Sequence, residues 1–215
     1  SLASLRMAAA QSGMQVASGS ATLQSRDYLE QYARTWGQPQ QRMMLFSLNS
    51  TSGLENIQTN ANPTSYPQLS DDGKVLTYIN DGNSSSIYDS RAHFSTLNGG
   101  VYTPSSEIDA PTGFPGYGDT SVSLSGTGSF AAAAWVRMGT DLPGKNAGDA
   151  VTLEEQNLLM NSTEIVVSVY NGSTWTSTRL TNDGTPDLAP ATAVGGDGNA
   201  IVFWRSVYTP DPGTQ

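Results

Sequence analysis

The feature that most constrains the fold is a hairpin pattern that occurs three times along the chain. A short strand, a turn that contains glycine and a longer apolar strand follow one another in SYPQLSDDGKVLTYIND (65–81), TSVSLSGTGSFAAAAWVRM (120–138) and LAPATAVGGDGNAIVFWRS (188–206). Gly73, Gly128 and Gly198 are expected to provide the positive φ that a tight hairpin turn needs. The strands after them, KVLTYI, FAAAAWV and AIVFW, are strongly apolar, so we expect burial on both faces.

A second kind of hairpin, with a more polar last strand, alternates with the first. Its three occurrences are RMMLFSLNSTSGLENIQTN (42–60), SIYDSRAHFSTLNGGVYTPSSEID (86–109) and EIVVSVYNGSTWTSTRLTND (164–183). The turns NSTSG, NGG and NGS separate the two strands of each. If the first kind supplies strands A and B and the second kind C and D, the chain runs C, D, then A to D twice, then A, B.

Two segments outside this pattern are predicted to be helical. Within the insert 139–162, Thr152 is a helix N-cap and Glu155, three residues later, completes a capping box. In the N-terminal segment 1–41, Ser25 is expected to begin a helix and Gly37 to end it. The predicted organisation is therefore the segment 1–41, strand units over 42–62, 63–113, 114–186 and 187–206, and a loop tail, 207–215.

Four-stranded antiparallel units that follow one another along a chain are typical of β-propeller blades. The stretch YPQLSDDGKVLTYIND resembles the repeat of TolB-type propellers. The stretch SVYNGSTW is similar to the Asp-box of sialidases and related BNR-repeat propellers, with Ser168, Gly172, Thr174 and Trp175 in the matching positions and Tyr170 in place of the aspartate, so that another group must cap the turn. The expected fold is all-β: a partial propeller of about three four-stranded blade-equivalents with short helical inserts.

Composition excludes several classes of partner. Ten basic residues against nineteen acidic ones give a net charge of −9, which opposes nucleic-acid binding. No apolar run is long enough to span a bilayer. The chain has no cysteine, hence no disulfide or thiolate metal site. Loops rich in Ser, Thr, Asn and Gly favour an extracellular or cell-surface location, with the periplasm as the alternative.

Four residues are candidates for ligand binding: Trp175 and Tyr170 at the Asp-box-like turn, and Arg179 and Arg91 in the C and D strands. No assembled catalytic constellation is recognisable, and the sole histidine, His93, fits a hydrogen-bonded or exposed strand residue better than a general base. Among the tryptophans, Trp175 is expected to be the exposed one, although an Asp-box tryptophan normally packs into its own hairpin.

The sequence implies no cofactor, and Ca²⁺ is the only ion considered. Asp71, Asp72 and Asp197 could supply oxygen ligands to it. Aspartate before glycine is equally what hairpin turns prefer without a metal, and turn chemistry is the favoured interpretation.

These features favour a non-enzymatic propeller module of a secreted or cell-surface protein, acting as a scaffold or a platform for a protein or glycan ligand. One alternative is a fragment of a sialidase-like propeller glycosidase whose catalytic residues lie partly outside this chain. Another is a TolB-like periplasmic protein-binding propeller. The remaining blades are expected to come from a longer parent chain or from a second copy, because unpaired sheet edges favour association.

Overall fold

The computed structural model describes residues 66–80, 89–114, 116–145 and 149–207, together with the backbone of 15–16, 43–46 and 54–58. The chain divides into two compact units, residues 1–63 and residues 64–215. The N-terminal helix expected between Ser25 and Gly37 lies outside the described residues.

In the first unit the predicted C/D hairpin is formed. Strand β2 (Met43–Phe46) pairs antiparallel with β3 (Leu54–Gln58). The two-residue strand β1 (Gln15–Val16) pairs in parallel with β2, which gives the sheet order β1-β2-β3.

The second unit contains three antiparallel sheets in chain order. The first holds β4 (Gln68–Leu69), β5 (Val75–Asn80), β6 (Arg91–Asn98), β7 (Val101–Tyr102) and β8 (Ser106–Glu107), with β7 and β8 both paired to β6, so the expected D strand is interrupted. The second is the four-stranded meander β9 (Tyr117–Gly126), β10 (Ala131–Met138), β11 (Thr163–Tyr170) and β12 (Trp175–Arg179). The third is the pair β13 (Asp187–Val194) and β14 (Ala200–Ser206). The prediction of an all-β protein is confirmed, but no sheet among the described strands closes into a ring.

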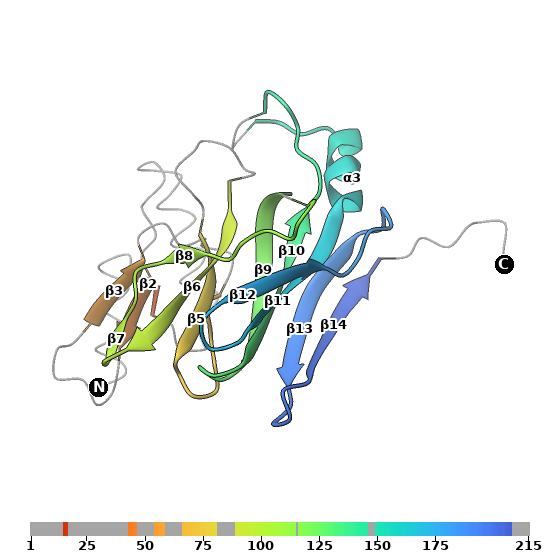
Figure 1. Ribbon diagram of the computed structural model, residues 1–215. Coiled ribbons are helices and arrows are strands. Elements are labelled where there is room, and N and C mark those ends of the chain that lie inside the picture. The colour runs from red at the N-terminus through yellow and green to blue at the C-terminus, as the bar shows by residue number, and fades with distance from the viewer. Residues whose placement is uncertain are drawn as a thin grey trace. The chain divides into compact units, whose positions relative to one another are not determined.

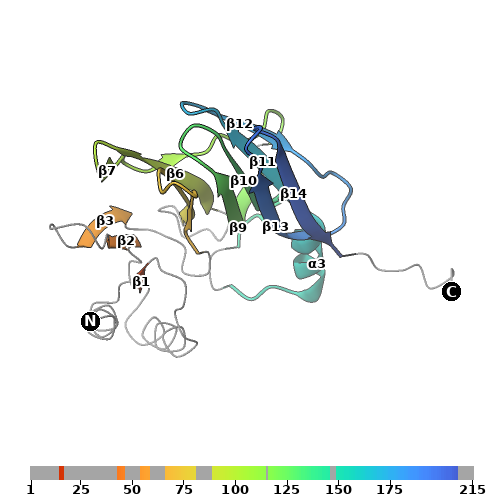
Figure 2. The same ribbon diagram turned by 90° about the horizontal axis from the view of Figure 1, so that it is seen from below.

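The second sheet lies between the other two (Figures 1 and 2). Strand β10 is buried along almost its entire length, as the run of four alanines predicts. Alternation along the strand sends Ala131, Ala133 and Trp135 into the core shared with Val75 and Ile79 of β5, and the intervening residues to the opposite face. Alanines on both faces let the neighbouring sheets approach closely.

The turn before β10 differs from the prediction in one residue. Gly126, with φ +114°, holds the left-handed conformation, whereas Gly128 does not. A Cβ at Gly126 would collide with the carbonyl oxygen of Phe130. Gly128 is instead required by a close approach, because a Cβ there would lie 2.7 Å from Cβ of Lys74 in the first sheet. Gly73 and Gly198 have positive φ, as predicted.

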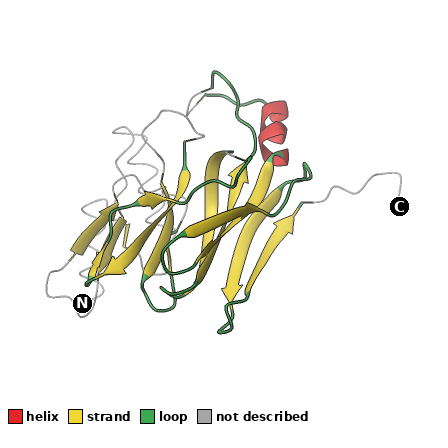
Figure 3. Ribbon diagram, in the orientation of Figure 1, coloured by secondary structure: helices red, strands yellow, loops and turns green. Residues whose placement is uncertain are grey.

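Helix α3 (Leu153–Asn161) is the one helix among the described residues and lies in the predicted insert between β10 and β11 (Figure 3). Its capping box is formed as predicted: the Thr152 hydroxyl accepts from the Glu155 N–H, and the Glu155 carboxylate accepts from the Thr152 N–H at 2.8 Å. These bonds hold the pKa of Glu155 below its ordinary value. The helix buries none of its residues.

The prediction that all three B strands are buried on both faces is wrong for β14. Strands β5 and β10 are buried, but Ile201, Phe203 and Trp204 of β14 are 55%, 63% and 42% exposed. The physical reason is the absence of a strand or sheet on the far side of β14 among the described residues.

Candidate ligand-binding site

Of the two aromatic residues predicted to bind ligand, Tyr170 belongs to the core and Trp175 packs against it. Tyr170 is buried, and its ring lies 5.0 Å from that of Trp175, between centroids. Trp175 is half-buried and contacts Phe94 of the first sheet edge-on at 5.6 Å. The expectation that Trp175 is exposed is therefore wrong, because the first sheet covers the hairpin from which it projects.

The Asp-box-like turn is capped by Asn171, one residue after the position where the aspartate is missing. Its Oδ1 accepts hydrogen bonds from the N–H groups of Ser173 and Thr174, at 3.0 and 2.9 Å, and from both of their hydroxyls. Gly172 adopts φ +93° beside it. An asparagine thus performs the capping role for which Tyr170 has no suitable group.

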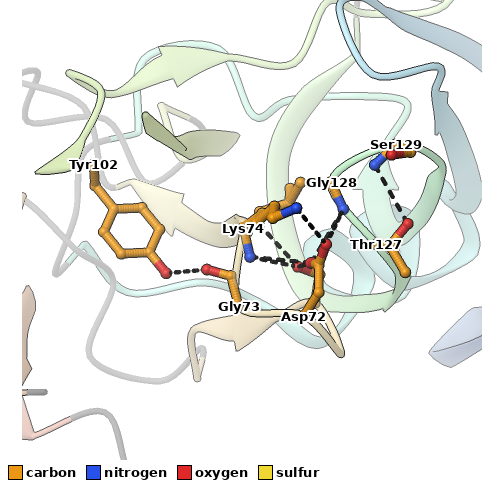
Figure 4. A network of polar contacts seen from close by, with 9 residues as sticks. Asp72, Gly73, Lys74, Tyr102, Thr127, Gly128 and Ser129 are labelled. Atoms are coloured by element: carbon orange, nitrogen blue, oxygen red, sulfur yellow. Dashed lines mark hydrogen bonds and ion pairs between the residues drawn. The ribbon is translucent and has the colours of Figure 1, made fainter. Parts of the chain in front are cut away.

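Asp72, a calcium candidate in the sequence, ties two sheets together (Figure 4). Its carboxylate accepts from the Gly128 N–H, at 2.9 and 3.1 Å, and from the N–H of Lys74 and the hydroxyl of Ser70. Burial opposes ionisation, but the N–H groups of Gly128 and Lys74, the Ser70 hydroxyl and the Lys74 ammonium outweigh it and lower the pKa of Asp72. The N–H of Asp71 donates to the Gly126 carbonyl at 2.9 Å and adds a second link.

Asp197 stabilises the turn in which it lies, between β13 and β14. Its carboxylate accepts from the Asn199 N–H at 3.1 Å and the Asn199 side-chain amide at 2.6 Å, which lower its pKa. Within the described part of the chain, no group of three or more His, Asp or Glu side chains could hold a metal ion. Asp71, Asp72 and Asp197 therefore do not form a shared cluster there.

The arginines lie in separate environments. Arg91 of β6 donates to the Ser90 carbonyl and lies 3.7 Å from the Glu107 carboxylate. Arg137 of β10 is fully buried, and its Nε and Nη2 donate to the two carboxylate oxygens of Asp119 at 2.6 and 2.7 Å. Arg205, which follows Trp204 near the end of β14 as Arg137 follows Trp135 near the end of β10, is exposed.

The Asp119–Arg137 pair is an inter-sheet link that sequence reasoning missed. Asp119 also accepts from the Ala92 N–H of the first sheet at 2.9 Å, and its own N–H donates to the Ser90 carbonyl. A Cβ at Gly116 would collide with the Arg137 side chain, so that glycine provides the necessary space. The pair thus links the first and second sheets.

His93 is half-buried and satisfied, as the sequence favoured. Its Nδ1 lies 2.6 Å from the Ser105 hydroxyl, and its ring contacts Tyr78. Burial and the charge of Arg91 lower the pKa of His93 to about 4, so the ring is neutral near pH 7.

Arg179 is the predicted binding residue that the structure places in a pocket. At the end of β12 its Nη2 donates to Glu164 Oε1 at 2.7 Å, and its Nε donates to the Thr181 carbonyl at 2.7 Å. The guanidinium carbon lies 4.0 Å from the ring centroid of Phe114, a cation–π contact. The Glu164 side chain is almost completely buried, whereas that of Arg179 is one-quarter exposed.

The pocket beside Arg179 has a volume of about 390 Å³ and opens to solvent. Phe114, Glu164 and Arg179 line it, with Leu158 and Asn161 from α3 and Asn182 from the loop after β12. Three guanidinium N–H groups of Arg179 have no acceptor among the described residues, and Glu164 Oε2 has no donor. We call these six residues the Arg179 pocket.

Sequence reasoning missed Glu164 and Phe114 as pocket residues. The sequence did contain a signal for Glu164. This residue comes first in the apolar stretch EIVVSVY, and a carboxylate that is buried with such a strand needs a partner. Phe114 lies in a loop with no periodicity, and only tertiary packing places it under Arg179.

No known protein family, curated protein or solved structure matches this chain. No helix in the described residues is long and apolar enough to cross a membrane.

Proposed function

We propose that this chain is a non-enzymatic binding module built on part of a β-propeller, and that the Arg179 pocket binds a neutral saccharide. The propeller interpretation is supported by three antiparallel sheets that follow one another in chain order and stack on one another. Ser123 and Ser125 of β9 bond the N–H groups of Thr192 and Val194 in β13, each at 3.1 Å, as expected for inner strands of adjacent blades.

The choice of a neutral saccharide as the ligand depends on one observation. The base of the pocket has no net charge, yet it offers several hydrogen-bond donors. Glu164 balances the charge of Arg179 at 2.7 Å, so no cationic group remains unpaired at this base to hold a carboxylate or phosphate. The free guanidinium N–H groups still point to hydrogen bonds with neutral oxygens. Hydroxyl groups both accept and donate, and so suit an arginine beside amide side chains.

The rest of the pocket fits the same ligand class. Asn161 and Asn182 are exposed and line the pocket with side-chain amides, and Leu158 offers an apolar surface for the C–H face of a sugar ring. The volume lies at the lower end of small-molecule sites. A secreted or cell-surface platform for glycans is the corresponding biological role.

The proposal is tested by titrating neutral oligosaccharides and sialosides into the ¹⁵N-labelled chain and mapping chemical-shift changes. We expect saturable changes around the Arg179 pocket with neutral sugars only. Asn182→Ala should weaken binding about 5–10-fold, the equivalent of one hydrogen bond. Arg179→Lys, which keeps the charge beside Glu164 but removes the planar donor array, should weaken it further.

Thr176→Ala, at an exposed position of β12 outside the pocket, is the matched control and should leave binding unchanged. Shifts at the Arg179 pocket with sialosides alone, or turnover of any glycoside, would favour the sialidase-like alternative. Capture of a periplasmic protein through this surface would favour the TolB-like one. No binding by any member of a broad neutral panel would refute the saccharide proposal.

A further inference from the structure

Strand β14 combines an apolar sequence with an open position. Its counterparts β5 and β10 each have a strand on both sides: β5 pairs with β4 and β6, and β10 with β9 and β11. Among the described strands, β14 pairs with β13 alone. Trp135 in β10 is completely buried, whereas Trp204, at the corresponding place in β14, is 42% exposed. An apolar strand with one unpaired edge is a template for another strand.

The turn before β14 shows the same incompleteness. In the first sheet, Asp72 reaches across to the turn of the second sheet and accepts from the Gly128 N–H. Asp197 occupies the matching turn of the third sheet and is exposed. In the described residues, all of the side-chain bonds of Asp197 are to Asn199. The third sheet thus presents a free edge and a carboxylate that could bind the turn of a further sheet.

We propose that the free edge of β14 is occupied by the hairpin β2–β3 of a second copy of this chain. This hairpin is of the C/D kind that completes the other two sheets, where β6 follows β5 and β11 follows β10. Among the described strands of its own chain, β2 has on its other side the two-residue parallel contact with β1. The antiparallel ladder to β14 replaces that contact with a longer one.

Chain order and sequence support this occupant. The hairpin β2–β3 precedes β4 as β11–β12 precedes β13, so its place in the chain order is that of an outer hairpin, and among the described strands no inner pair is joined to it. The apolar sequence MMLF of β2 suits a strand that is covered on both faces. If each copy donates its hairpin to the other, both third sheets reach four strands, and the pair contains six sheets of four or five strands, a number within the usual range of propeller blades.

The test is the mass of the intact chain in solution by size-exclusion chromatography with light scattering. We expect a dimer. Phe203→Lys on β14 and Leu45→Lys on β2 should each yield a monomer, because lysine on a strand edge opposes pairing. Leu153→Lys, at an exposed apolar position on α3 outside the Arg179 pocket, is the control and should remain dimeric.

Mixing the two monomeric variants is the decisive measurement. The Leu45→Lys chain retains an intact β14, and the Phe203→Lys chain retains an intact hairpin, so a heterodimer should form through one restored contact. Circular dichroism confirms that each variant is folded, and Met44→Lys replaces Leu45→Lys if the latter does not fold. A monomeric wild type overturns the proposal. A dimer that persists in both β2 variants overturns it as well, because β14 then pairs with something else, such as β14 of the partner.

Discussion

The ion pair between Asp119 and Arg137 allows a quantitative test of what links the first and second sheets. Both side chains are essentially unexposed, and the carboxylate accepts three hydrogen bonds, two from the guanidinium and one from the Ala92 N–H. Asp119→Asn retains one acceptor oxygen and places an NH₂ group against the guanidinium, so Arg137 remains buried with an uncompensated charge. Removal of one member of such a pair costs about 3–5 kcal/mol of unfolding free energy.

The double variant separates the cost of an unpaired charge from the value of the pair. Arg137→Met alone leaves the carboxylate buried with the Ala92 N–H, and we expect a loss of about 3 kcal/mol. Asp119→Leu combined with Arg137→Met removes both charges, and should be less destabilising than the two single changes together by at least about 2 kcal/mol. Urea unfolding followed by tryptophan fluorescence gives these values from the shift in midpoint at constant slope.

Two outcomes would refute the reasoning. One is a cost below about 1 kcal/mol for Asp119→Asn, the range of exposed pairs. The other is additivity of the two single changes. The free energy that the Asp119–Arg137 pair contributes to stability should also change little when the salt concentration is raised, because a buried ion pair is poorly screened.

Two further predictions concern titration and the turn contacts. His93 has a pKa of about 4 in the folded protein against 6.5 as its ordinary value, so the unfolded chain takes up the proton first as the pH falls. Its contribution is complete above pH 6.5 and is lost towards pH 4; the full shift corresponds to about 3 kcal/mol, which partial exposure of the ring reduces to about 1–2 kcal/mol. His93→Asn should flatten the stability difference between these pH values, and a slope equal to that of the wild type contradicts this. Asp72→Ala should lose about 2 kcal/mol in thermal or urea unfolding, since it removes the bond to Gly128, whereas Asp71→Ala should be close to neutral; equal losses would show that the inter-sheet bond contributes nothing.

Much of the strand layout was predictable from the sequence because hairpins and caps are local. The turns at Gly73 and Gly198 require positive φ, and the alternation of apolar strands with polar turns located both kinds of hairpin. The capping box of α3 depends on residues three positions apart, Thr152 and Glu155, and was therefore also visible. The propeller arrangement itself stays a proposal.

The candidate site was predictable only in part. The structure places Arg179 in a pocket, whereas Trp175 and Tyr170 pack together near Phe94 of another sheet, a contact that the local sequence does not reveal. Ligand binding by any of these residues stays a prediction. Arg91 was placed by the sequence in a C strand, and the structure adds its ion pair with Glu107. The calcium candidates Asp72 and Asp197 proved to hold turns.

The sequence by itself determined where strands, turns and one helix cap occur, since backbone propensity and side-chain alternation act over a few residues. The tertiary structure alone decided which apolar strand is covered and which charge has a partner. The strands FAAAAWV and AIVFW have similar sequences, yet β10 is buried between two sheets and β14 is open, because burial depends on what packs from elsewhere in space. For the same reason, Arg137 is buried against Asp119 while Arg205 faces solvent.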